Sequence, residues 1–303
     1  PPLPSPSASP LPSPSAPAQL LPYHRLALLA QPRKWWRPLA VLGVAVGFYA
    51  ALMVALIVGA LILGQFIPAV NAAMDTTTED MSDPVYLAFA LASIAAMLPA
   101  CWLAVLVVGR RRPGTLSSVT GRLRWAMVAQ ACGVTAVMFV VAQGVSLLLA
   151  PDAPSSFEPL PQAAALLAVI IVLVPVQAAA EEYAFRGILM QTLGAWLRHP
   201  AWAIALPIPL FVIGHDSSWL GLLAVGVFAL LAALLSWRSG GLELAIGMHV
   251  VNNVLAFSAG ALGLVDLNST EVSAGAAAFS IGYTVITAAV LLGVNERSRR
   301  RTL

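Results

Sequence analysis

The sequence predicts an all-α, polytopic membrane protein that folds as a bundle of about eight transmembrane helices. Hydrophobic residues make up 59% of the 303 residues and charged residues only 10%, whereas about 25% of a soluble domain is charged. Apolar runs of about 20 residues, long enough to cross a bilayer, recur along the chain. The basic residues gather in alternate loops between these runs. Together these observations exclude a soluble domain.

The N-terminal segment, residues 1–38, precedes the first span. Residues 1–19 are almost entirely Pro, Ser, Ala and Leu, and we expect a disordered or polyproline II tail because this composition cannot form a core. The segment ends in Arg33-Lys34-Trp35-Trp36-Arg37. Cations beside paired tryptophans are typical of an anchor at the bilayer surface. Nucleic-acid binding is not expected of a basic cluster this close to a span.

The remaining chain divides into three N-terminal spans (39–150), a core (151–260), and a last span with a basic tail (261–303). The predicted spans cover residues 39–67, 86–108, 125–150, 163–180, 201–214, 219–237, 242–259 and 274–294. The fifth is short, since a helix of its length rises about 21 Å, less than the hydrocarbon thickness. We therefore expect it to stop inside the protein beside a wet cavity.

Charge predicts the orientation of the bundle. If successive loops alternate between two sides, all 16 Lys and Arg residues fall on the side of the N-terminus. The other side receives only acids: Asp75, Glu79, Asp80, Asp83, Asp152, Glu158, Asp266 and Glu271. The positive-inside rule then predicts that both termini are cytoplasmic. Lys34 is the only lysine beside fifteen arginines, a bias that favours a GC-rich bacterial genome and hence a bacterial plasma membrane.

Two adjacent acids, Glu181 and Glu182, follow the fourth apolar run. An ionisable group at membrane depth costs several kcal/mol unless it is paired or wetted, so it is a candidate functional residue. Glu182 can form an ion pair with Arg186, four residues later on the same helix face. Glu181 is turned by about 100° from Glu182 and stays available as a base. The alternative is that both acids are solvated and paired at the cytoplasmic mouth.

Three further polar residues lie in apolar runs. His215 follows Phe211 by four residues, and His249 precedes Asn253 by four, so each pair shares a helix face. A lone histidine on an apolar helix is usually a packing residue, but three polar groups at one end of one bundle indicate a site. Glu243 begins its helix and is expected to complement the helix dipole.

The motifs EExxxR, FxxxH and HxxxN, in this order on successive membrane helices, resemble the CPBP family of intramembrane proteases. That family includes the type II CAAX prenyl endopeptidases and bacterial bacteriocin-processing or immunity proteins. Here the motifs span residues 181–186, 211–215 and 249–253, and the resemblance covers about residues 160–260. It implies an eight-helix bundle with a cavity open to the cytoplasm. It also implies hydrolysis of a peptide bond in a hydrophobic or membrane-anchored substrate.

The resemblance also implies a role for each motif residue. Glu181 would deprotonate the attacking water and His215 would hold that water. His249 and Asn253 would stabilise the oxyanion, while Glu182 and Arg186 would orient the first motif. Glu181, His215 and His249 would further form a His2Glu set of the kind that binds catalytic Zn²⁺, although the HExxH signature is absent. A zinc metalloendopeptidase and a metal-free glutamate mechanism both stay open.

One geometric condition follows, because on straight helices Glu181 would lie near the cytoplasmic end and His215 about 21 Å from it. The site closes if the fourth span continues past Glu181, so residues 182–197 are predicted to be helical and partly embedded. Two other functions remain: a non-catalytic immunity or assembly protein that binds a hydrophobic peptide, and a transporter that uses the acids as a relay. The polar groups gather toward one face, which disfavours transport.

Overall fold

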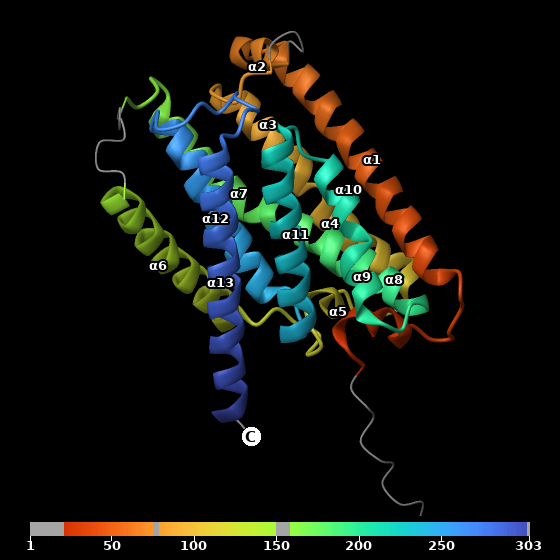
Figure 1. Cartoon of the computed structure of the whole chain (residues 1–303). Coiled ribbons are helices and arrows are strands. Elements are labelled where there is room, and N and C mark those ends of the chain that lie inside the picture. The colour runs from red at the N-terminus through yellow and green to blue at the C-terminus, as the bar shows by residue number, and fades with distance from the viewer. Residues whose placement is uncertain (1–20, 75–78, 150–157, 302–303) are drawn as a thin grey trace, which may run out of the picture.

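The computed structural model describes residues 21–74, 79–149 and 158–301, and these form an all-α bundle with no named strand (Figure 1). The predicted tail at residues 1–19, and Asp75 and Asp152, lie outside the described residues. The elements are η1 (Tyr23–Leu29), α1 (Arg37–Gly64), α2 (Pro68–Ala73), α3 (Pro84–Ala95), α4 (Met97–Ala104), η2 (Val105–Gly109), α5 (Gly114–Ser117), α6 (Trp125–Leu149), α7 (Ala163–Glu182), η3 (Tyr183–Leu189), α8 (Met190–Trp196), α9 (Pro200–Ala205), α10 (Pro207–Ile213), α11 (Trp219–Ser239), α12 (Glu243–Ala261) and α13 (Ala274–Arg301).

Seven helical segments in the described part of the chain are long and apolar enough to cross a membrane. They are Arg37–Gly64, Pro84–Gly109, Trp125–Leu148, Ala163–Trp196, Trp219–Ser239, Glu243–Ala261 and Ala274–Arg297. The fifth predicted span is not among them, because it forms the short pair α9 and α10. Pro207 and Pro209 explain the break, since proline removes a backbone donor and its ring clashes with the preceding turn. The pair still leads from the lower toward the upper end of the bundle in Figure 1.

The fourth span is longer than its apolar run at residues 163–180. α7 continues through the π-helix η3 into α8, giving 34 helical residues from Ala163 to Trp196. Tyr183, Arg186 and Met190 on this continuation are buried. The prediction that residues 182–197 stay helical and partly embedded is therefore confirmed, with the helix ending at Trp196. Glu181 consequently lies near the middle of the span.

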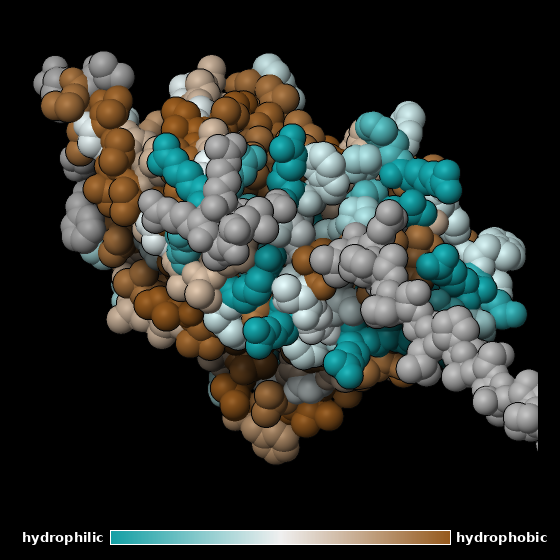
Figure 2. Space-filling view, turned by 90° about the horizontal axis from the view of Figure 1, so that it is seen from below, coloured by the Kyte–Doolittle hydropathy of each residue, from teal (hydrophilic) through white to brown (hydrophobic). Residues whose placement is uncertain are grey.

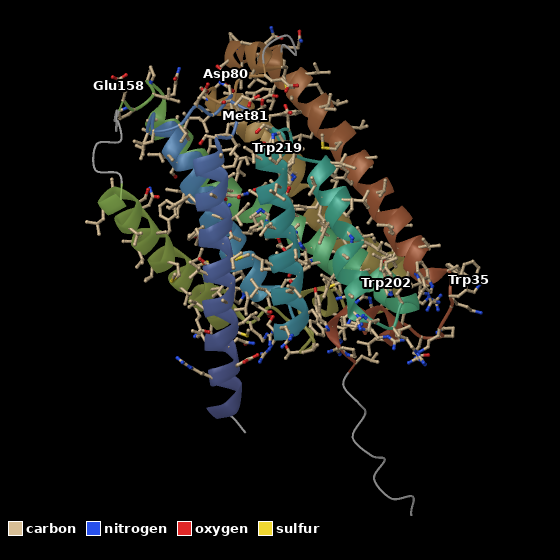
Figure 3. The ribbon with its side chains drawn as sticks, in the orientation of Figure 1. Trp35, Asp80, Met81, Glu158, Trp202 and Trp219 are labelled. Atoms are coloured by element: carbon tan, nitrogen blue, oxygen red, sulfur yellow. The ribbon has the colours of Figure 1, made fainter. Side chains whose placement is uncertain are left out.

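The two ends of the bundle differ in charge. η1 and the C-terminal end of α13 lie at the lower end in Figure 1, together with the segments before α1 and α6. We call this the arginine end, after Arg25, Arg33, Arg37, Arg110–Arg112, Arg122, Arg124, Arg198 and Arg238. Figure 2 views it directly and shows hydrophilic residues gathered across it. The upper end, where Figure 3 labels Asp80, Glu158 and Trp219, we call the acidic end.

α12 holds the bundle together by packing on α6, α7 and α11. It approaches α6 closely, since a Cβ on Gly247 would lie 2.5 Å from the Cβ of Ala131. α7 also packs on α3, and α11 on α13. The outer helices α1 and α6 expose many large apolar side chains, as expected of helices whose outer face is covered by lipid.

η1 packs against α8 at the arginine end. Tyr23 is 1% exposed, and its hydroxyl donates a hydrogen bond to the backbone carbonyl of Leu116. Burial raises the pKa of Tyr23 well above its ordinary value. Close approach needs glycine in α8, because a Cβ on Gly194 would collide with the carbonyl oxygen of His24.

Candidate active site

Both acids of the first motif are buried at the C-terminal end of α7. Glu181 is 7% exposed and Glu182 is fully buried. Because η3 and α8 extend the span beyond them, the acids lie inside the bundle. The alternative that they are solvated at the cytoplasmic mouth is therefore wrong. An acid this deep needs specific partners to offset the loss of water.

Glu182 finds its partner in Arg186, as their spacing predicts. Arg186 Nη1 lies 3.0 Å from Glu182 Oε1, and Arg186 Nη2 donates to the carbonyl oxygen of Ala229 at 3.1 Å. The guanidinium also stands 4.4 Å from the ring centroid of Phe211. The buried arginine thereby joins α7 and η3 to α10 and α11.

His249 bridges the two acids. Its Nδ1 donates to Glu182 Oε1 at 2.8 Å, and its Nε2 lies 3.3 Å from Glu181 Oε2. Since Nδ1 carries a proton, the second contact is attractive only when a proton also lies on Nε2 or on Oε2. The ring of Phe228, 4.8 Å away at 65°, fixes the imidazole from the side. Glu181 and His249 are thus arranged to share a proton.

His215 follows the last turn of α10 and contacts Phe211, the first residue of the same motif. Its Nδ1 donates to the carbonyl oxygen of Phe211 at 2.8 Å, and the two rings lie 4.7 Å apart. A carbonyl can only accept, so the proton of a neutral His215 is on Nδ1. Nε2 then keeps a lone pair that can accept a hydrogen bond from water.

Asn253 is held by a residue that the sequence analysis missed. Its Nδ2 donates to Oε1 of Gln177 at 3.3 Å, and Gln177 is 4% exposed. Gln177 precedes Glu181 by one helical turn, so it shares a face with the acid. A lone glutamine in an apolar run, four residues before a candidate base, is the signal that would have found it.

One cavity of about 420 Å³ collects these groups. Glu181, His215, His249 and Asn253 all line it, together with Gln177, Asn252 and apolar side chains. Glu182 and Arg186 do not line it and lie behind His249. Four of the six predicted site residues therefore line the same cavity. The other two, Glu182 and Arg186, hold His249 from behind.

Two loops line part of the cavity. Its outer part is lined by Gly214, Ser217 and Val272, which lie in the loops before α11 and α13. Both loops belong to the acidic end (Figure 1). The resemblance implied a cavity open to the cytoplasm, whereas these lining loops lie at the end of the bundle opposite to the basic, predicted cytoplasmic end.

The predicted zinc set does not fit this arrangement. Both ring nitrogens of His249 face carboxylates, so neither is free to bind a metal. Among the residues that the structure describes, no three His, Cys, Asp or Glu side chains lie close enough to hold one ion. Glu181, His215 and His249 therefore line one cavity without forming a coordination site.

Glu243 has a structural role, as expected, though with a different partner. It is fully buried, and its two carboxylate oxygens receive Arg124 Nε at 2.8 Å and Nη2 at 2.7 Å. Such a two-point contact fixes the planar guanidinium. The pair joins the segment before α6 to the start of α12, outside the cavity.

The comparisons with known proteins agree with the motif positions. Residues 162–255 match the family model for Type II CAAX prenyl endopeptidase Rce1-like proteins. The chain is also 26% identical over 231 residues to the uncharacterized protein YyaK of Bacillus subtilis (strain 168), covering 72% of this chain and 76% of that protein. No solved structure matches the chain significantly.

Proposed function

We propose that this chain, whose residues 162–255 form an Rce1-like domain, is an intramembrane endopeptidase that hydrolyses a peptide bond in a hydrophobic or membrane-anchored substrate. The observation that carries the proposal is the pairing of buried Glu181 with His249 inside a cavity that also presents His215 and Asn253. The match to the family model supports protease activity in general, and the mechanism below is argued from the residues.

Glu181 acts as the general base. Its Oε2 is buried against His249 Nε2, while the residue lines the cavity. We therefore assign Oε1 to accept a proton from a water in the cavity, with the shared proton on His249 Nε2. General base catalysis by a positioned side chain contributes about 10²- to 10⁴-fold to the rate. His215 Nε2 accepts the other hydrogen of that water and thereby orients its oxygen.

The oxyanion is stabilised by Asn253. One Nδ2 hydrogen is directed to Gln177, which leaves the second for the developing charge. A preorganised donor of this kind contributes about 10²- to 10³-fold. We assign His249 to the base and not to the oxyanion as first expected, because both of its nitrogens face carboxylates. His249 Nε2 then donates its proton to the leaving nitrogen, and the proton that Glu181 took from water passes to Nε2, which restores both groups.

Glu182 and Arg186 keep this machinery in place. The carboxylate of Glu182 orients the His249 ring through Nδ1, and Arg186 neutralises that carboxylate. Removing one partner from a buried ion pair costs about 3–5 kcal/mol. Variants of either residue are therefore expected to lose stability together with activity.

The experiment compares protein termini in membranes that contain the native chain or Glu181→Gln. The matched control is Glu296→Gln, since Glu296 is a half-exposed acid on α13. We expect new termini within hydrophobic segments for the native chain and the control, and none for Glu181→Gln. The same new termini with Glu181→Gln would contradict the proposal. A cellular phenotype that survives the substitution would instead favour a non-catalytic immunity or assembly protein.

A transporter is less well supported by this structure. A relay needs polar groups that reach both faces of the membrane. Here the buried Glu182–Arg186 pair closes the cavity on the side of the arginine end. A pH-driven flux of protons or ions across liposome membranes that is lost in Glu181→Gln would instead support a transporter.

We further propose that the protein resides in a bacterial plasma membrane with the arginine end in the cytoplasm. The described arginines outside the bundle interior lie at one end, and the described loops of the other end carry acids (Figure 3). The bilayer and its lipids are then direct partners of α1 and α6, and no feature of the site calls for nucleic acid.

A further inference from the structure

On α11 and α13, the residues that line the cavity lie in the half of each helix next to the acidic end. α11 begins at that end with Trp219, and its lining residues, from Gly221 to Phe228, lie within about 14 Å of its start. α13 also begins there, and its lining residues, from Ala277 to Thr284, lie within about 15 Å of its start. The far halves of both helices contribute nothing to the cavity.

The outer part of the cavity is framed by two loops that bond to each other. The backbone N–H of Ser218 donates to the carbonyl oxygen of Thr270 at 2.8 Å, and the N–H of Val272 donates to Ser218 Oγ at 3.1 Å. Gly214 and Asp216 in the first loop and Glu271 in the second are exposed. The two loops are therefore held together by hydrogen bonds, and they carry exposed residues at the acidic end.

The inner part of the cavity is closed. Glu182, Arg186 and Phe211, together with Ala229 on α11, are at most 3% exposed. The first seven residues of α12, from Glu243 to His249, are all buried. These described residues therefore form a packed layer between Glu181 and the arginine end.

We propose that the scissile segment reaches Glu181 from the acidic end, so that the substrates are apolar segments presented at the extracytoplasmic half of the membrane. The inference rests on the proposed function, which makes the bound segment a substrate. It also rests on the positive-inside rule, which places the acidic end outside the cytoplasm. The cavity volume is in the range of a small-ligand pocket, which admits an extended apolar segment and excludes a folded domain. Leu91, Val225 and Phe257 in its wall select apolar side chains.

The test measures access of reagents to cysteines and needs no cleavage. In a chain with Cys101→Ala and Cys132→Ala, three single cysteines are compared: Ser217→Cys at the outer part, Ala224→Cys in the cavity wall, and Thr120→Cys in the loop before α6. Ser217 and Thr120 are both loop hydroxyl residues and form the matched pair. The probe is a membrane-impermeant, charged methanethiosulfonate.

In right-side-out membrane vesicles we expect Ser217→Cys and Ala224→Cys to react and Thr120→Cys to stay unmodified. In inside-out vesicles we expect the reverse. Reaction of Thr120→Cys in right-side-out vesicles would overturn the orientation. Reaction of Ala224→Cys only in inside-out vesicles, or from neither side, would overturn the route. Since labelling is independent of hydrolysis, these failures are distinguishable from a failure of the protease proposal, which Glu181→Gln tests.

Discussion

At the scale of single residues, the site depends on a chain of contacts that runs from Arg186 through Glu182 and His249 to Glu181. Glu182 Oε1 bonds to both Arg186 and His249, and the chain ends at Glu181, whose carboxylate lines the cavity. A buried polar network is costly unless its members are bonded. The carboxylate of Glu181, which lines the cavity next to His249, is therefore the point at which chemistry is expected.

Gln177→Met should lower kcat and leave KM nearly unchanged. Methionine has a similar shape but cannot accept the hydrogen bond from Asn253, so the amide of Asn253 loses its orientation. A net hydrogen bond contributes about 0.5–1.5 kcal/mol, which corresponds to a loss of up to about ten-fold. The measurement is cleavage, in proteoliposomes, of a substrate identified by its new termini.

The matched control for this substitution is Gln191→Met. Gln191 is also a buried glutamine, but it bonds to the carbonyl of Thr115 outside the cavity. It should alter stability and spare kcat. Equal losses of kcat in both variants would show that Gln177 acts only on folding.

Metal chelation should not change the cleavage rate. Both nitrogens of His249 face carboxylates, so the base works through a shared proton. The measurement compares the rate with 1,10-phenanthroline and with its non-chelating 1,7 isomer. A loss specific to the chelating isomer that Zn²⁺ restores would return Glu181, His215 and His249 to the role of a zinc set.

At the scale of elements, the fourth span decides where the acid lies. The apolar run ends at residue 180, and the helix continues through η3 and α8 to Trp196, as the need to bring Glu181 close to His215 predicted. Polar side chains such as Gln191 and Thr192 hid the continuation from a reading based on hydropathy. They are buried because they bond to the backbone of the segments around them.

Gly194→Ala should detach η1 from α8. The new Cβ would meet the carbonyl oxygen of His24, a backbone atom that cannot rotate away. Overpacking of this kind costs about 1–3 kcal/mol, more than the gain of about 1 kcal/mol from replacing glycine in a helix. We expect faster tryptic cleavage after Arg25 and a lower thermal midpoint in detergent.

Gly133→Ala provides the control, since nothing lies near a Cβ added at that position of α6. It should slightly raise the midpoint. If Gly194→Ala behaved in the same way as Gly133→Ala, the close packing of η1 on α8 would be refuted.

At the scale of the whole molecule, composition and charge predicted much of the architecture. The helical class follows from apolar runs, because a bilayer permits few other structures, and the sorting of arginines follows from the orientation of the loops. The depth of the cavity did not follow. It depends on how far α10 and the loop containing His215 project past Glu181, and that distance is set by helix packing and by the breaks at Pro207 and Pro209.

The position of Trp219 links the proposed hydrolysis to the thickness of the bilayer. This indole is 73% exposed at the first residue of α11, and tryptophans of this kind settle among headgroups. α11 is 21 residues long and therefore about 31 Å from end to end, close to the hydrocarbon thickness of about 30 Å. Lipids with longer acyl chains would place the outer part of the cavity, next to this indole, inside the hydrocarbon layer. The rate of substrate cleavage should therefore fall in vesicles with thicker bilayers, while the protein stays folded. Equal cleavage rates in phosphatidylcholines of increasing chain length would mean that the outer part of the cavity does not lie at the level of the headgroups.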